Sequence, residues 1–282
     1  KDTSALVAVY QSLLTSEQTP IAEKAELLKF PELSVFYDVV SPVDVTALAE
    51  AVKSLLLALI PALREDLLAG LAVKPSHAED DLSFAAMSER ALQNSLLQLL
   101  VKSEDESVVE FADNLFAKAT TMNAKMSALT ALNQFSGEVR ENALNAFYEQ
   151  FKDDPQVVDK WLSLEASANV EGVIERIKAL SKHPAFSFTT PNKVRSLYSV
   201  FCMRNPEQFH RFDGKGYQLL SDLIYKLDDI NPSTSARLVS PLTQWRKFDD
   251  KRAGLMCEKL KQLLSKPNLS KDVYVIVSKS LG

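Results

Sequence analysis

Three histidines and two cysteines are the residues of this 282-residue chain best suited to hold a metal ion or attack a substrate. The histidines are His77, His183 and His210, and no two are spaced three or four residues apart like a zinc-binding pair on a helix. Cys202 and His210 could form a thiol–imidazole pair, but no orienting acid is evident, which favours an inert buried cysteine. We therefore expect surface or capping histidines, no metal site and no catalytic residue within this chain.

Three short motifs suggest other chemistry but have simpler interpretations. Asp213-Gly214-Lys215-Gly216 has too few glycines, and no Lys-Ser/Thr pair, for a phosphate-binding loop, so it predicts a tight turn with glycine at positive φ before a helix. The acidic run Glu104-Asp105-Glu106 fits the positive end of a helix dipole. Trp245-Arg246-Lys247-Phe248 is basic and aromatic, but Asp249-Asp250 follows at once, which favours a solvated helix junction over a nucleic-acid patch.

Composition and charge exclude several classes of protein. Lysine and arginine number 32 against 37 aspartates and glutamates, and the net charge of −5 disfavours non-specific nucleic-acid binding. The low glycine count of 7 disfavours turn-rich all-β folds and nucleotide-binding loops. Two cysteines are too few for a disulfide scaffold and indicate a reducing, cytoplasmic setting.

The chain shows no membrane or export signal by sequence. The most apolar run, Leu55 to Leu63, contains Pro61 and is followed by Arg64-Glu65-Asp66, so we expect no membrane partner. No signal-peptide pattern is present at the start. Because the first residue is lysine, we expect a processed product or a piece of a longer protein.

The prolines indicate where helices begin. A Ser, Thr, Asp or Asn directly before a proline can cap a helix, since its side chain accepts a free amide and the proline needs no N–H at the first helical position. Seven of the 12 prolines follow such a residue: Thr19-Pro20, Ser41-Pro42, Asp154-Pro155, Thr190-Pro191, Asn205-Pro206, Asn231-Pro232 and Ser240-Pro241.

The apolar spacing between these points is helical. One stripe runs from Val108 to Phe116, and Ser103 with Glu106 before it predicts a capping box. The chain predicts helices at 4–15, 20–29, 42–60, 62–72, 82–102, 105–118, 122–134, 138–152, 155–168, 170–182, 191–204, 215–229, 232–239, 241–246, 249–265 and 270–280. The last contains the alternating Val273, Val275 and Val277, but a lone strand would have no partner, so we keep it as a helix.

Short connections between consecutive helices predict antiparallel hairpins. A long run of such hairpins stacks into an α-solenoid rather than a closed bundle. No fixed-period repeat or long linker divides the sequence. We therefore predict an all-α fold, an irregular superhelix of helical hairpins, with residues 1–282 as a single domain.

Several segments resemble one known family. They are Thr190–Leu197, Phe209–Tyr217 and Asn231–Leu238 continuing through Pro241-Leu242 to Asp249–Arg252, with Val158–Trp161 and Ser88–Leu92 upstream. In this order they resemble the C-terminal helical domain of bacterial aminopeptidase N, a zinc metallopeptidase of the gluzincin type. The resemblance covers essentially the whole chain and is strongest from about residue 155 onward.

The resemblance implies a two-layered superhelix that closes over an upstream catalytic domain and walls a chamber for peptides. The parent enzyme would remove N-terminal residues from peptides with a zinc-activated water. The family's His-Glu-x-x-His and Gly-x-Met-Glu-Asn motifs do not occur here. They are therefore expected upstream, so that this chain has no cofactor of its own and the parent holds the zinc.

Two arginines correspond to family positions near the substrate channel. Arg195 matches the arginine of the segment Pro-Asn-x-x-Arg-x-Leu, and Arg237 that of Asn-Pro-x-x-x-x-Arg-Leu. A guanidinium suits a peptide carboxylate or carbonyl, so a channel role is chemically reasonable. A structural or surface arginine remains the alternative at both positions.

Two other functions stay open at this point. The chain could be a stand-alone α-solenoid that binds proteins without catalysis. It could also be an enzyme with a scattered site, which the absence of a catalytic motif disfavours. A His-Glu-x-x-His motif in the full-length gene product would separate the first hypothesis from both.

Overall fold

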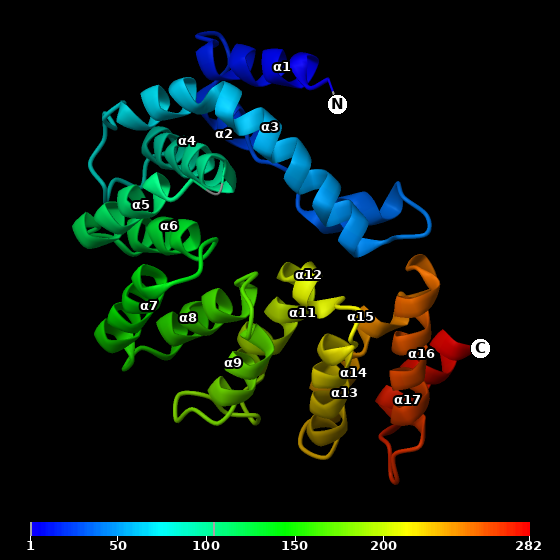
Figure 1. Ribbon diagram of the computed structural model, residues 1–282. Helices are drawn as coiled ribbons and strands as arrows, with labels where there is room; N and C mark the ends of the chain where they lie inside the picture. Colours follow the sequence, from blue (N-terminus) through cyan, green and yellow to red (C-terminus); the bar gives the residue numbers. More distant parts are fainter. Residues whose placement is uncertain (1, 104) are drawn as a thin grey trace. The chain divides into compact units, whose positions relative to one another are not determined.

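The computed structural model describes residues 2–103 and 105–282, and it consists of helices joined by short loops (Figure 1). Across these residues the extended backbone forms a single isolated bridge, between Val43 and Phe248, and no strand. The predicted all-α class is therefore confirmed.

The helices belong to two compact units. Unit 1 comprises Lys1–Glu32 and Glu50–Asn145, and unit 2 comprises Leu33–Ala49 and Ala146–Gly282. The chain crosses between the units three times, and two of these boundaries, at 49/50 and 145/146, fall inside a helix.

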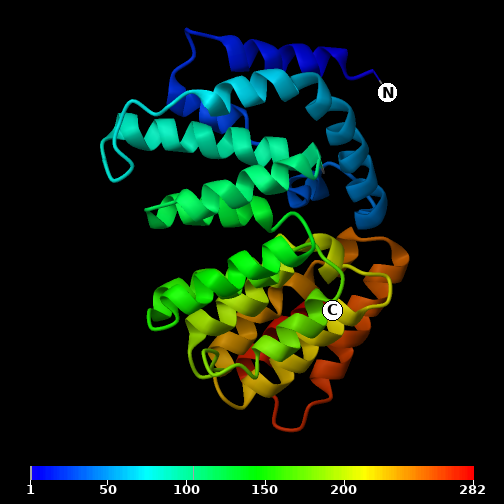
Figure 2. The ribbon, with the colours of Figure 1, turned by 60° about the vertical axis from the view of Figure 1, so that its left-hand side comes forward.

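Unit 1 is built mainly from long helices. In it α2 packs against α4, α5 against α6, and α4 against α6. The two ribbon views show α4, α5 and α6 as neighbouring helices (Figures 1 and 2). The helices that lie wholly or largely in this unit are α1 (Ser4–Thr15), α2 (Ile21–Leu27), α3 (Val45–Ala72), α4 (Phe84–Leu100), η2 (Val101–Ser103), α5 (Ser107–Lys118), α6 (Met122–Leu132) and the first half of α7 (Glu138–Phe151).

Unit 2 contains more and shorter helices. Here α8 packs against α9 and the α10–α11 region, while α13, α14, α16 and α17 pack against one another in pairs. Its elements are η1 (Leu33–Asp38), α8 (Pro155–Ser167), α9 (Val173–Leu180), α10 (Pro191–Val194), η3 (Arg195–Ser199), α11 (Val200–Arg204), α12 (Pro206–Phe209), α13 (Lys215–Asp228), α14 (Pro232–Leu238), α15 (Ser240–Thr243), η4 (Trp245–Lys247), α16 (Asp250–Leu264) and α17 (Lys271–Leu281).

Five of the seven cap–proline pairs place the proline in the first turn of a helix, as predicted: α8, α10, α12, α14 and α15. The Thr19-Pro20 pair lies one residue too early, because α2 begins at Ile21. The prediction at Ser41-Pro42 is wrong, since this peptide bond is cis and α3 begins at Val45. Asp44 caps α3 instead, accepting hydrogen bonds from the amides of Thr46 and Ala47.

The predicted break at Pro61 is also wrong, because α3 continues through it. Proline removes the bond to the carbonyl four residues earlier, which belongs to Leu57. Pro61 and Leu57 are both exposed, so this stretch of α3 faces solvent.

Among the described residues, α3 is the one helix long and apolar enough to cross a membrane by length and composition. Its most buried side chains are Leu59, Ile60, Leu63 and Leu67. Core helices of soluble proteins pass the same test, so this single helix is weak evidence for a membrane span.

Three further expectations have clear outcomes. The helix over Val273 and Val277 is confirmed as α17, where both valines are buried. The prediction of a capping box at Ser103 and Glu106 is wrong. At the start of α5 it is Asp105 that accepts a hydrogen bond, from the backbone amide of Ser107. The predicted helix 191–204 is interrupted by the π-helical turn η3. The Asn205-Pro206 pair indicated the start of α12, but no helix range was predicted there.

Candidate functional site

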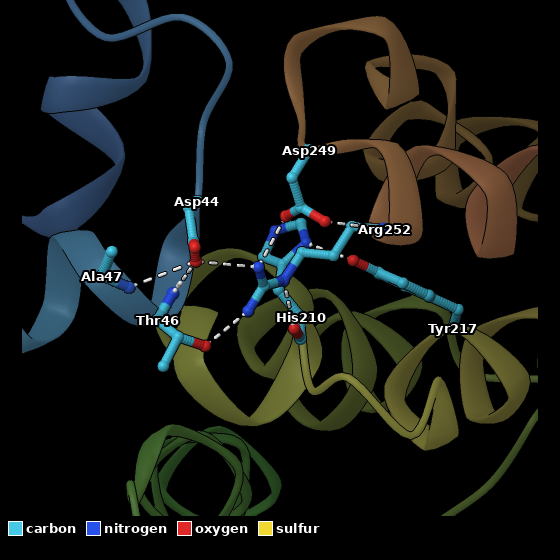
Figure 3. Close-up of polar contacts among 7 residues, drawn as sticks. All are labelled: Asp44, Thr46, Ala47, His210, Tyr217, Asp249 and Arg252. Carbon is cyan, nitrogen blue, oxygen red and sulfur yellow. Dashed lines mark hydrogen bonds and ion pairs between the residues drawn. The ribbon is translucent and has the colours of Figure 1, made fainter.

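A buried arginine organises a polar cluster in unit 2. Arg252 is 1% exposed, and its Nε donates to the backbone oxygen of His210 at 2.7 Å. Its Nη1 lies 3.1 Å from the Asp44 carboxylate and 2.6 Å from that of Asp249, and its Nη2 donates to the Thr46 hydroxyl at 2.6 Å (Figure 3). We call Asp44, Thr46, His210, Asp249 and Arg252 the Arg252 cluster.

Both carboxylates of this cluster also begin helices. Asp44 caps α3, and hydrogen bonds, first that from the Ala47 amide, hold its pKa below the usual range. Asp249 accepts from the Arg252 amide at 3.1 Å and caps α16. The guanidinium therefore pairs with two capping carboxylates, which offsets part of the cost of burying its charge. The cluster fixes the 33–49 segment to α16 within unit 2.

His210 is buried, so the expectation of a surface or capping histidine is wrong at this position, and the ring lies among aromatic side chains beside Arg252. Its ring stacks on Phe248 at 4.4 Å between centroids and meets Tyr37 edge-on, while its Nδ1 lies 2.8 Å from the Tyr217 hydroxyl. Burial, with a smaller contribution from the Arg252 charge, lowers the pKa of His210 to about 3. Burial also raises the pKa of Tyr37 and Tyr217 above the usual range. A neutral, buried imidazole between neutral phenols supports packing rather than proton transfer.

The glycine-dense segment forms the predicted turn next to this cluster. Gly214 has φ of 72°, and α13 begins at Lys215. Gly216 faces the backbone oxygen of Phe209, which would lie 2.1 Å from an added Cβ. Glycine here permits close packing of two backbones, not phosphate binding.

A second polar contact joins two of the segments that carry the family resemblance. The Lys193 side chain is largely buried, and its Nζ donates to the backbone oxygen of Pro155 at 2.8 Å and lies 3.0 Å from the Asp159 carboxylate. This ion pair ties the start of α10 to α8. Lys193 and Arg252 both lie in the quoted motifs, but the sequence did not single them out, because a buried charge cannot be recognised without its partner.

The two candidate channel arginines are exposed and lie on different elements. Arg195 begins the π-helical turn η3, and its Nη2 donates to the side-chain oxygen of Asn192 at 2.8 Å. Arg237 lies in α14, which packs against α13 and α17. Within the described residues no contact joins the two arginines. The π turn is a second signal at Arg195, since such turns are frequent at functional sites.

The other candidate residues have structural roles. Burial raises the pKa of the Cys202 thiol above its usual range, which makes it a poor nucleophile. His183 accepts the Ala185 amide at its Nδ1, and the Nδ1 of His77 lies 3.1 Å from the Glu89 carboxylate. Lys247 pairs with Asp38 at 2.7 Å. Glu104, in the acidic run, lies outside the described residues.

The part of the chain that the structure describes contains no group of three His, Cys, Asp or Glu residues placed to hold a metal ion. The side chains present here therefore do not fit a catalytic zinc.

Comparison with known proteins covers the whole chain. Residues 1–282 match the family described as a domain of unknown function (DUF3458_C) with ARM repeats. Aminopeptidase N of Caulobacter vibrioides is 32% identical over 95% of this chain and 31% of the relative. Aminopeptidase N of Escherichia coli is 29% identical over 97% of this chain and 31% of the relative.

A solved structure agrees with these relatives. The structure of Legionella pneumophila aminopeptidase A in complex with aspartic acid matches all of this chain, and 34% of its own chain, with a TM-score of 0.90 and 31% identity. The chain thus spans about a third of the length of the proteins it matches. The resemblance to the C-terminal helical domain of bacterial aminopeptidase N is confirmed, and ARM repeats are α-solenoids, as the helical hairpins indicated. The chain belongs to the DUF3458_C family of ARM-repeat domains.

Proposed function

We propose that this chain is the non-catalytic domain of a zinc aminopeptidase, and that it closes over the active site and walls the chamber that receives peptides. One observation carries the proposal: the chain matches aminopeptidases along its whole length yet spans only about a third of theirs. A chain of this relative length, whose described residues contain no group placed to hold a metal, is best explained as a supporting domain.

The proposal assigns the chemistry to residues outside this chain. Zinc, held by the catalytic domain, would supply an activated water for attack on the first peptide bond. This chain would form part of the wall of the peptide chamber. Arg195 and Arg237 would contact the part of the peptide that lies beyond the cleaved bond. The substrates would be peptides and the compartment the cytoplasm.

Buried polar contacts in unit 2 suit a domain that has to keep its shape. The Arg252 cluster and the Lys193–Asp159 pair cross-link elements far apart in sequence. A surface that excludes folded proteins must resist deformation, and well-satisfied buried polar networks make a structure rigid.

Size selection tests the closing role. The full-length protein should release N-terminal residues from short peptides but leave a folded protein with an accessible N-terminus intact. After proteolytic or genetic removal of this domain, the remaining catalytic part, if it stays folded, should lose that discrimination. If the ratio of peptide to protein hydrolysis is the same with and without the domain, then the domain does not exclude folded proteins from the active site.

A further inference from the structure

A cavity of about 810 Å³ lies inside unit 1. It is bounded by the end of α3, the loop after it, and α4, α5 and α6, which are neighbours in Figures 1 and 2. Small-molecule sites in proteins have volumes of roughly 300–1,000 Å³. The cavity is therefore large enough for a ligand, and it shares no residue with the Arg252 cluster.

The interior of this cavity is apolar. Leu97 and Ala128 are buried, and Ala91, Phe111 and Ala124 are half-buried along its lining. Such walls offer methyl groups and one aromatic ring rather than hydrogen bonds. They fit an alkyl or aromatic body.

Large apolar side chains also reach solvent around the cavity. Val73 is 64% exposed, Met87 47% and Leu115 37%, and all three line it. Single exposed apolar residues are ordinary, but several that share one cavity indicate a binding surface.

Most polar groups of the lining already have partners. Gln93 donates to the backbone oxygen of Gly70, and Ser127 donates to Asn94. Arg90 donates to the backbone oxygen of Asp81 at 2.6 Å. Glu79 accepts from the hydroxyls of Thr120 and Thr121, which lowers its pKa. These groups therefore have structural roles in the lining, because their hydrogen bonds are already made within the protein.

Two cations of the lining are different. Lys74 and Lys118 are exposed, and neither has a hydrogen bond or ion pair with any described residue. With Arg90 they give the lining three positive charges against the single negative charge of Glu79. The chain as a whole carries −5, so this cavity is a local excess of positive charge over an apolar interior.

We propose that this cavity binds an amphiphilic carboxylate, with its apolar body against Leu97, Phe111 and Ala124 and its carboxylate near Lys74 and Lys118. Apolar burial would supply affinity, and the ammonium groups of Lys74 and Lys118 would select for the acid. Two sources share this chemistry, a free fatty acid and a peptide that ends in an apolar residue. The site is independent of the function proposed above.

Calorimetry on the full-length protein tests the site. Octanoate, decanoate and dodecanoate, each below its micelle concentration, should bind one per chain, and each added methylene should tighten binding about fourfold until the cavity is full. Dodecylamine should bind at least tenfold more weakly than dodecanoate. N-acetyl-Leu-Phe forms the second arm: tighter binding than octanoate assigns the site to peptide ends, and weaker binding assigns it to fatty acids.

Three variants locate the binding. Lys74→Met with Lys118→Met should weaken dodecanoate at least tenfold and leave dodecanol unchanged. Ala124→Phe should weaken both ligands, because its ring would occupy the apolar wall against which their alkyl chain is proposed to lie. Lys160→Met removes an exposed lysine of unit 2 and is the matched control, expected to bind like the wild type. Absence of saturable binding, equal binding of acid and amine, or equal effects of the double variant and Lys160→Met would overturn the proposal. Since both lysines are exposed, the double variant should fold even if Ala124→Phe does not.

Discussion

Individual side chains in unit 2 show which functional expectations can be tested by substitution. Arg195 and Arg237 are exposed, and Arg195 donates a hydrogen bond to the side-chain oxygen of Asn192, in the preceding helix α10. Both are therefore free to reorient toward a ligand without breaking the core.

Substitution of either arginine should separate long substrates from short ones. In the full-length protein, Arg195→Ala or Arg237→Ala should lower kcat/KM for a tetrapeptide roughly ten- to hundred-fold, since a charge-assisted contact contributes about 1.5–3 kcal/mol. For a single-residue chromogenic substrate, which has no peptide beyond the cleaved bond, kcat/KM should fall far less. Steady-state kinetics with both substrates measure this difference. Equal losses of kcat/KM for the two substrates would count against a channel role.

Gly216 should tolerate no side chain. Gly216→Ala should lower the free energy of unfolding by several kcal/mol, because its Cβ would lie 2.1 Å from a backbone oxygen that cannot move aside. Gly254→Ala, inside α16 with nothing within 4 Å, is the matched control and should be neutral or stabilising by up to about 1 kcal/mol. Urea unfolding of both variants measures the contrast. Similar stabilities would mean that α12 and α13 are packed less closely than described.

His210 should make stability depend on pH. Its native pKa of about 3 is below the ordinary 6.5, so between these values the unfolded chain binds a proton that the native chain does not. The contribution of the neutral imidazole is complete above pH 6.5 and is lost as the pH falls toward 3, at about 1.4 kcal/mol per pH unit.

Urea unfolding at pH 5.5 and pH 4.5 measures this loss. His210→Asn should show a loss smaller by about 1.4 kcal/mol between the two values, since asparagine does not titrate there. NMR of the wild type should show no titration of the His210 ring above pH 5. A ring that titrates near 6.5 would contradict the buried, neutral imidazole.

The helix starts show how much the sequence could establish about the elements. Cap–proline pairs located the starts of α8, α10, α12, α14 and α15 because a proline in the first turn of a helix is favoured by the local backbone alone. The helix start predicted at Ser41-Pro42 is wrong because Asp44 caps the helix instead. Asp44 lies in the 33–49 segment, which is held by Arg252, more than 200 residues away in the sequence. The helix break predicted at Pro61 is wrong because a helix can continue through an exposed proline, and the exposure of Pro61 depends on how the whole helix packs.

The capping contacts themselves differ between similar pairs. Asn231 accepts the Thr234 amide at 3.0 Å, whereas Thr190 makes no side-chain capping bond. Asn231→Ala should therefore cost about 1 kcal/mol of unfolding free energy, and Thr190→Ala less than about 0.5. Thermal and urea unfolding of the pair test this, and equal costs would show that the side-chain bond at α14 contributes nothing.

At the scale of the whole molecule, the sequence established the class of fold and the family, but not the partnered charges. Helical periodicity and cap–proline pairs are local, and the family motifs are contiguous, so both can be read without coordinates. The Arg252 cluster, the Lys193–Asp159 pair and the cavity of unit 1 arise from residues that only the fold brings together. No spacing rule predicts such contacts.

The role proposed for this chain is to support an aminopeptidase whose chemistry lies elsewhere in the protein. The most direct measurement compares zinc content and hydrolysis of an aminoacyl chromogenic substrate for the full-length protein and for residues 1–282 alone, after metal-free dialysis and readdition of zinc. We expect the full-length protein to retain about one zinc per chain and to hydrolyse the substrate, and residues 1–282 to do neither. Zinc binding with hydrolysis by residues 1–282, or no aminopeptidase activity in the zinc-loaded full-length protein, would contradict the account.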